Sequence, residues 1–258
     1  MIIGNKRFQN YTYVMAIINL TPDSFWKDSR ASADGALFAA ERAIKEGAAV
    51  LDLGAQSTRP GYAEVGAEEE IARLEKPLSA IVREFDIPVS VDTYYASVAQ
   101  FALDAGAHMI NDVWGLSREE EMRRVISARG ASVCIMHNST VSVEGDVFPP
   151  VEQFLIRQAN LAEECGISRD KICLDGGIGF AKSREQNLAL LKGYGRLKAL
   201  GYPLLLGCSR KSLFGGKVED RLPQTLAATR AAAKNGILFV RVHDVKQNVE
   251  EITKAYEN

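Results

Sequence analysis

Seven polar residues of this sequence stand at or near the ends of short apolar runs that are typical of strands. They are Asn19, Asp92, Asn111, Asp175, Ser209, Arg241 and His243. Burying such a group without a hydrogen-bond partner costs about 1–3 kcal/mol. A fold that repeats this arrangement on so many strands is expected to direct these side chains toward one shared ligand.

Two of these residues, Asp92 and Asp175, are carboxylates on different runs, with no cluster of further carboxylates at metal-ligand spacing. These carboxylates are expected to recognise an organic ligand rather than hold a metal, because a carboxylate accepts two N–H donors from the edge of an amidine-like heterocycle. Asn111 can donate and accept along the same edge. The neighbouring Asp52 and Asp112 are interpreted as structural, and strand alternation predicts that Asp112 faces away from Asn111.

The last apolar run carries a basic pair. Side chains alternate along Phe239–His243, so Arg241 and His243 are expected to share one face. The run before it ends in Gly207–Ser212, which contains Lys211. A guanidinium binds phosphate oxygens through two parallel hydrogen bonds, and a lysine adds a point charge. This pattern predicts an anion pocket beside the last two strands.

The elements that must position these residues alternate along the whole chain. Eight strands are expected at Val14–Asn19, Ala49–Gly54, Pro88–Thr93, His108–Trp114, Ser132–His137, Ile172–Gly176, Pro203–Ser209 and Leu238–Asp244. Eight helices are expected at Ala33–Glu46, Glu68–Glu84, Tyr95–Ala105, Arg118–Ala128, Val151–Glu164, Glu185–Leu200, Leu222–Asn235 and Lys246–Tyr256. The alternation predicts a single-domain α/β chain, a (β/α)₈ TIM barrel over residues 1–258, with a doubly wound open sheet as the alternative. Residues 1–13 are expected to form a hairpin that caps the bottom of the barrel.

Composition sets the class of protein. The chain has 258 residues, 47% hydrophobic and 25% charged, with a net charge of −2. These values are ordinary for a globular protein and argue against a nucleic-acid partner, which calls for a basic face. No apolar run has the length of a membrane span, the N-terminus does not resemble a signal peptide, and the four cysteines form no CxxC motif. A cytoplasmic protein with reduced thiols is therefore expected.

Seven motifs at the expected strand ends and loops carry a resemblance to a known family. They are Asn19–Phe25, Ser57–Gly61, Ser90–Thr93, Ile110–Asp112, Gly177–Phe180, Ser209–Ser212 and Arg241–Asp244. Together they cover about residues 13–250 and resemble the dihydropteroate synthases, the folate-pathway transferases that sulfonamides inhibit. The resemblance implies that the chain joins 6-hydroxymethyl-7,8-dihydropterin diphosphate to p-aminobenzoate, with Mg²⁺ accompanying the diphosphate. It also implies a homodimer packed through the last barrel helices.

The resemblance also implies roles for individual residues. It assigns the pterin pocket to Asp92, Asn111, Asp175 and Lys211, and it gives Gly207 and Met136 as further substrate-binding residues. The diphosphate site falls to Arg241, His243 and Asn19, of which Asn19 also reaches the metal. The loops and the p-aminobenzoate site correspond to Phe25, Thr58, Arg59, Pro60, Phe180 and Ser212. The residues implied in catalysis are Asp92, Lys211, Arg241 and Arg59.

The sequence departs from the family pattern in four places. These are the Trp26-Lys27 pair in the first loop, Gln56, the His137-Asn138 turn, and Gly176, which stands where the family usually has Pro. None of them removes a residue that the resemblance assigns to binding. They bear on the details of the substrate loops and on sulfonamide sensitivity.

Two alternative functions share a pterin pocket. A methyltetrahydrofolate:corrinoid methyltransferase would need a corrinoid-protein partner and has no use for a diphosphate site, so Arg241 and His243 argue against it. A catalytically silent pterin-binding paralogue should have lost the loop motif Asn19–Phe25, the loop motif Ser57–Gly61, or the basic pair Arg241 and His243. The sequence retains all three of these features.

Overall fold

Eight parallel strands close into a barrel in the computed structural model, which describes residues 1–20, 29–56 and 64–257. The strands run in the order β10-β3-β4-β5-β6-β7-β8-β9. Their bounds are β3 Tyr13–Asn19, β4 Val50–Gly54, β5 Val89–Asp92, β6 Met109–Asp112, β7 Ser132–Met136, β8 Ile172–Asp175, β9 Leu204–Leu206 and β10 Phe239–Val242. Because β10 pairs with β3, with Val240 opposite Val14, the sheet has no free edge and the open-sheet alternative is wrong.

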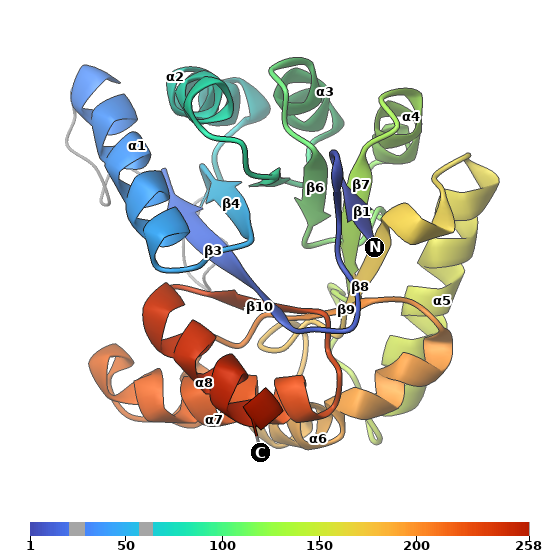
Figure 1. Cartoon of the computed structure of the whole chain (residues 1–258). Helices are drawn as coiled ribbons and strands as arrows, with labels where there is room; N and C mark the ends of the chain where they lie inside the picture. The colour runs from blue at the N-terminus through green and yellow to red at the C-terminus, as the bar shows by residue number, and fades with distance from the viewer. Residues whose placement is uncertain (21–28, 57–63, 258) are drawn as a thin grey trace.

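Helices surround these strands (Figure 1). The α-helices are α1 Ser29–Lys45, α2 Ala67–Glu84, α3 Ala96–Asp104, α4 Glu121–Ala128, α5 Phe148–Glu164, α6 Arg184–Lys192, α7 Leu222–Lys234 and α8 Val245–Glu257. Short 3₁₀ helices are η1 Arg169–Lys171, η2 Tyr194–Leu200, η3 Ser212–Phe214 and η4 Val218–Arg221. The predicted barrel is confirmed. Within the described ranges, no helix is long and apolar enough to cross a membrane.

One predicted helix is interrupted. The expected helix Glu185–Leu200 ends at Lys192, and the chain continues after Gly193 as η2. A Cβ atom on Gly193 would lie 2.5 Å from Cζ of Phe148, so this position has no room for a side chain. The break turns Tyr194 into the barrel wall, where its hydroxyl donates to Asp175.

The predicted strand His108–Trp114 is also shorter than expected, since β6 ends at Asp112. The two carboxylate oxygens of Asp112 accept hydrogen bonds from the backbone N–H groups of Trp114 and Leu116, at 2.7 and 2.8 Å. These bonds satisfy a tight turn and remove the chain from the sheet. A carboxylate that bonds its own turn is a structural group, as the sequence indicated.

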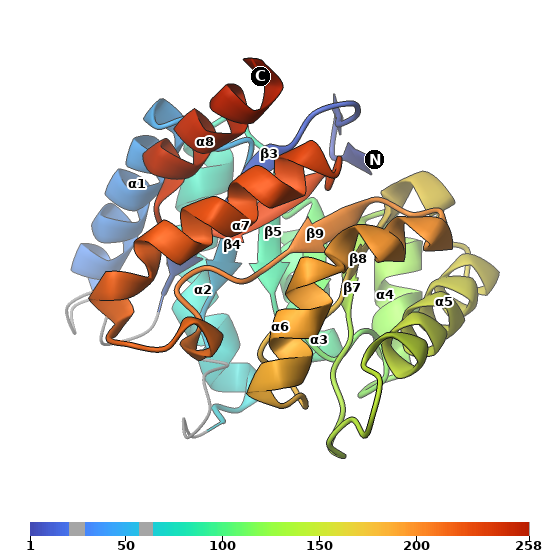
Figure 2. The same ribbon diagram turned by 90° about the horizontal axis from the view of Figure 1, so that it is seen from below.

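The N-terminal segment forms the predicted hairpin, from β1 Ile2–Ile3 and β2 Lys6–Arg7. The side chain of Ile3 is fully buried in a cluster with residues from the beginnings of the barrel strands, among them Met15, Val50 and Phe239. Both termini lie at the top of Figure 2, away from the connection between β7 and α5. The hairpin therefore closes the end of the barrel at which the strands begin.

Candidate functional site

A charged cluster joins side chains of four strands around Arg241 of β10. Its Nε donates to Oδ2 of Asp52, and its Nη2 donates to Oδ2 of Asp92, both at 2.6 Å. Asn111 of β6 donates from Nδ2 to the same Asp52 oxygen at 3.2 Å. Arg241, Asp92 and Asn111 thus come together as the sequence predicted, and Asp52 is the residue that links them.

Charge balance in this cluster is unusual because every member is largely covered. Burial raises the pKa of Asp92, and the Arg241 guanidinium opposes that rise. Burial alone would lower the pKa of Arg241, but the charges of Asp52 and Asp92 outweigh it and raise that pKa. The guanidinium therefore stays protonated between two carboxylates, while Oδ1 of Asp52 has no hydrogen-bond partner within the described part of the chain.

Asp175 lies at the end of β8, and its two carboxylate oxygens have different surroundings. Its Oδ1 accepts from the backbone N–H of Gly177 at 2.8 Å and from the hydroxyl of Tyr194 at 2.9 Å. Its Oδ2 faces Gly207, where a Cβ atom would stand only 3.2 Å away. The missing side chain at Gly207 leaves room for a ligand beside Oδ2. Burial raises the pKa of Asp175, and Lys211 opposes the rise.

Lys211 follows β9 and interacts with the loop after β8. Its Nζ donates to the carbonyl oxygen of Ile178 and lies 4.5 Å from the centre of the Phe180 ring. Burial lowers the pKa of Lys211 to about 8, and the charge of Asp175 works against this shift. Ser212 follows directly as the first residue of η3. Lys211 and Phe180 are therefore neighbours, as expected for parts of one site.

Met136 closes the apolar side of the same region. It is buried with Tyr94 and Val113, and Phe180 packs against this small cluster. An aromatic and thioether surface of this kind suits one face of a flat heterocycle.

His243 and Asn19 lie at the same end of the barrel. The Nδ1 of His243 is 3.0 Å from the hydroxyl of Ser209, and the ring is exposed. Asn19 is the last residue of β3 and is partly buried. Arg210, in contrast, donates to both carboxylate oxygens of Asp244 and so does not face the charged cluster as an anion ligand.

The remaining predicted site residues are Phe25, Thr58, Arg59 and Pro60, and they lie outside the described residues. So does the Trp26-Lys27 pair. Their predicted roles stay predictions.

Sequence reasoning missed a partly buried lysine that holds the loop after β8. The Nζ of Lys182 donates to the carbonyl oxygens of Gly177 and Phe180, each at 2.9 Å, and lies 2.8 Å from Nδ1 of His137. Burial lowers the pKa of Lys182 to about 7. Burial and the nearby lysine lower the pKa of His137 to about 4. The neutral imidazole therefore serves as the third acceptor for the three N–H bonds of the ammonium.

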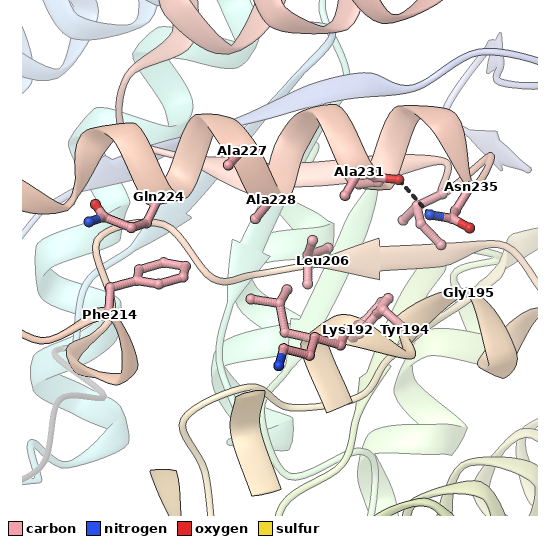
Figure 3. A pocket seen from close by; sticks show the side chains of 13 residues that line it. Lys192, Tyr194, Gly195, Leu206, Phe214, Gln224, Ala227, Ala228, Ala231 and Asn235 are labelled. Atoms are coloured by element: carbon pink, nitrogen blue, oxygen red, sulfur yellow. Dashed lines mark hydrogen bonds between the residues drawn. The ribbon is translucent and has the colours of Figure 1, made fainter. Parts of the chain in front are cut away.

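A cavity of about 300 Å³ lies elsewhere, on the outer side of the barrel wall between α6, η2 and α7 (Figure 3). Its lining is mostly apolar and includes Leu206, Phe214 and the alanine-rich face of α7. None of the predicted site residues that the structure describes lines it. Tyr194 is its one link to the site, because that residue lines the cavity and also bonds Asp175.

The described donor set suits a heterocycle and an anion better than a resident metal. In the part of the chain that the structure describes, no three His, Cys, Asp or Glu side chains gather at a distance suited to a metal ion. Asp175 and Asn111 can read the polar edge of a flat ring. Lys211 and Arg241 supply positive charge at the same end of the barrel.

Comparison with known proteins gives consistent results. Residues 15–243 match the family of pterin binding enzymes. The dihydropteroate synthase of Clostridium beijerinckii is 42% identical over 256 residues, which cover 96% of this chain and 95% of that protein. The crystal structure of dihydropteroate synthase from Clostridium difficile in the presence of pteroic acid has a TM-score of 0.93 at 40% identity, covering 97% of both chains. The Xanthomonas albilineans dihydropteroate synthase with 4-aminobenzoic acid has a TM-score of 0.91 at 36% identity, covering 96% of this chain and 93% of that one.

Proposed function

The chain belongs to the pterin binding enzyme family, and to the dihydropteroate synthases within it, and from that premise we propose how its barrel works. The reaction joins 6-hydroxymethyl-7,8-dihydropterin diphosphate to p-aminobenzoate and releases diphosphate and 7,8-dihydropteroate. The bond from the pterin methylene to the diphosphate oxygen breaks, and a bond from that carbon to the arylamine nitrogen forms. We propose that the whole chain serves this reaction as one pterin-binding domain.

Pterin recognition is assigned to the polar groups around β5, β6 and β8. The free Oδ2 of Asp175 accepts from the amino edge of the ring, where Gly207 leaves space. Lys211 donates to the ring carbonyl and its neighbouring nitrogen. Asn111 and Asp92 bind the opposite edge, and Met136 packs against a ring face.

Departure of the diphosphate leaves positive charge on the pterin methylene. Buried carboxylates stabilise such charge more strongly than solvated ones, because the low local dielectric does not screen them. Asp92 and Asp175 are both buried, at 8% and 5% exposure. These two residues therefore stabilise the cation electrostatically and need not accept a proton.

The leaving diphosphate is assigned to Arg241 and His243, with Mg²⁺ as its counterion. Mg²⁺ keeps several waters and is commonly held by one or two protein oxygens together with substrate phosphates. Asn19 fits one such oxygen, and the described residues offer no complete metal cage. Asn19 would hold the ion together with the substrate phosphates, and the ion would supply positive charge against the developing charge of the leaving group.

The second substrate is assigned to the loop side of the site. Phe180 and Ser212 form its wall, and by family resemblance Phe25, Thr58, Arg59 and Pro60 complete it. Excluding water matters here, because water would otherwise capture the cation. No strong general base is required, since an arylamine is already nucleophilic.

One observation supports this proposal above the others. Two buried carboxylates, a lysine and an arginine from four separate strands or strand ends interact electrostatically at one end of the barrel. Such a cluster combines a heterocycle-binding edge with cations for a leaving anion. A corrinoid-dependent methyl transfer would need only the first of these parts.

The test is a turnover assay that follows diphosphate and dihydropteroate together, with and without Mg²⁺. Both products should appear, and Asp175→Asn should abolish pterin binding while the fold remains intact. Diphosphate without dihydropteroate would mean that water captures the cation. Pterin binding without either product would contradict the proposal and identify a silent pterin-binding protein.

We also propose a cytoplasmic homodimer and sulfonamide sensitivity, on family resemblance. The dimer would use α7 and α8, which are joined by bonds from Arg230 to Glu251 and from Thr229 to Asn248, at 2.8 and 2.6 Å. Light scattering at micromolar concentration would measure the mass. A monomer would contradict the first proposal, and turnover that sulfonamides leave unchanged would contradict the second.

A further inference from the structure

Tyr194 is a buried residue that the proposed reaction does not use, although its hydroxyl contacts Asp175. Only 4% of its surface is exposed. It lies at the start of η2, where the break at Gly193 turns it inward. Its hydroxyl accepts from the backbone N–H of Gly176 at 2.8 Å and faces two acceptors, Oδ1 of Asp175 at 2.9 Å and the carbonyl of Leu205 at 2.5 Å.

Gly176 and Tyr194 depend on each other. A Cβ atom on Gly176 would lie 3.1 Å from Cε2 of Tyr194 and 3.1 Å from Cδ1 of Leu197. A larger residue at 176 would therefore push against the tyrosine ring. Proline there would also remove the N–H group that the hydroxyl accepts. The glycine thus provides both the space and the donor that hold this hydroxyl in place.

These contacts give the two carboxylate oxygens of Asp175 different roles. Oδ1 is occupied by Gly177 and Tyr194, so the carboxylate cannot rotate without breaking hydrogen bonds. Oδ2 is then left facing the space at Gly207. A carboxylate must be ionised to accept two N–H donors from a ligand. A hydroxyl that donates to it favours the ionised form.

We propose that Tyr194 is a positioning residue for pterin recognition, which orients Asp175 and keeps its carboxylate ionised. This proposal rests on the proposed function, because it assumes that Asp175 binds the pterin. The Tyr194 hydroxyl acts through Asp175 and does not itself touch the substrate.

Other charged and titratable groups also act on Asp175 and set the background for a pH experiment. Arg241 of β10 stays cationic between pH 5 and 9, whereas Lys182 from the loop after β8 and Lys211 after β9, with pKa values of about 7 and about 8, lose their charge within this range in both wild type and variant. Two thiols also interact with Asp175: Cys134 of β7 and Cys208 after β9. A hydrogen bond with Cys173, together with burial, raises the pKa of Cys134, and burial raises the pKa of Cys208 to about 12, so both thiols stay neutral near pH 7. Among the groups that act on Asp175, Tyr194 is the one at which a substitution removes a single oxygen atom without removing a charge.

The experiment measures affinity for pteroic acid by calorimetry between pH 5 and 9 in wild type and Tyr194→Phe. We expect the acidic limb of the affinity profile to move up by about one pH unit, as loss of one hydrogen bond to an ionised group predicts. At pH 9 the two affinities should differ much less. The ligand's own titration is the same for both proteins and cancels in the comparison.

The matched control is Tyr202→Phe. Tyr202 is also buried, at 5% exposure, but its hydroxyl bonds Glu163 and Arg169, away from the site. This variant should leave the acidic limb unchanged.

A second variant covers the case in which Tyr194→Phe fails to fold because Gly176 loses its acceptor. The double variant Gly176→Pro with Tyr194→Leu removes the hydroxyl and the orphaned N–H together, and it should show the same upward shift. An unchanged limb, or equal loss of affinity at every pH, would overturn the proposal. A downward shift would also overturn it, because it would mean that the hydroxyl proton resides on Leu205. Wild type that fails to bind pteroic acid at any pH would instead refute the assignment of Asp175.

Discussion

At the level of single residues, the charged cluster depends on one guanidinium that pairs with two buried carboxylates. Asp52 and Asp92 share Arg241, and both bonds measure 2.6 Å. Removing the cation from such a cluster leaves two buried anions, at a cost of about 3–5 kcal/mol. Arg241 therefore has a structural role beside its proposed role at the diphosphate.

A pair of variants separates these two roles. Arg241→Met should lower the free energy of unfolding by about 3–5 kcal/mol and reduce turnover strongly. Adding Asp52→Asn should recover part of the stability, because one buried charge disappears, but none of the turnover. Urea unfolding and initial rates on the same samples measure both. Recovery of turnover in the double variant would show that Arg241 acts only through the fold.

Glu70 makes stability depend on pH. It is 1% exposed, neither of its carboxylate oxygens has a hydrogen-bond partner among the residues that the structure describes, and burial raises its pKa from 4.5 to about 7. The folded state thus holds this proton more tightly than the unfolded state, so the contribution is full below about pH 4.5 and is lost as pH rises through 7. Glu70→Gln should match wild type near pH 5 and exceed it by about 2 kcal/mol at pH 8. Urea unfolding at pH 5 and at pH 8 measures this difference in stability. Glu69→Gln is the control, because Glu69 is exposed on the same helix.

At the level of elements, the loop after β8 connects the predicted binding residues. Lys182 holds the carbonyls of Gly177 and Phe180, and Lys211 donates to the carbonyl of Ile178 between them. Phe180 and Lys211 are therefore placed by one short segment. A change in that segment should affect binding of the second substrate more than the chemical step.

Lys182→Met tests this idea, because methionine keeps the length of the side chain and removes its donors. We expect the KM for p-aminobenzoate to rise about tenfold with a smaller change in kcat, as loss of hydrogen bonds from a charged group predicts. Lys198→Met is the control, since Lys198 also donates to a backbone carbonyl, of Asn235, at 2.9 Å. A proportional fall of kcat with KM unchanged would contradict the expectation.

The sequence predicted the barrel because period and length are local signals. Every predicted strand forms, and Asp92, Asn111, Asp175 and Arg241 lie at strand ends as expected. The sequence gives Asp52 a structural interpretation, and its bond to Arg241 joins residues 189 positions apart, which a local pattern does not show. Periodicity predicts a helix that includes Tyr194, whereas helix α6 ends where Gly193 packs against Phe148, a contact between separate segments that a local pattern does not show. Periodicity therefore identified the strand ends, while the residues that orient them depended on packing.

For the whole molecule, the two ends of the barrel have different roles: one holds the candidate site, and apolar packing closes the other. The charged cluster, Asp175 and Lys211 lie where the strands end. The hairpin and its apolar cluster close the end where the strands begin, and Ser132 donates to the carbonyl of Ile2 at 2.6 Å to fasten it. Separation along the strands lets packing at one end vary without moving ligands at the other.

Ile3→Ala tests this separation. Ile3 is fully buried, so truncation should lower the free energy of unfolding by about 2–4 kcal/mol. The kcat and both KM values at 25 °C should stay within twofold of wild type, about 0.4 kcal/mol, because the cavity forms at the far end of the barrel. Phe38→Ala on α1 is the control, since that ring is 70% exposed and its removal should change stability little. Urea unfolding and steady-state rates on one preparation give both quantities. A large rise in either KM would mean that the base of the barrel sets the geometry of the site, and the two ends would then have to be treated as one cooperative unit.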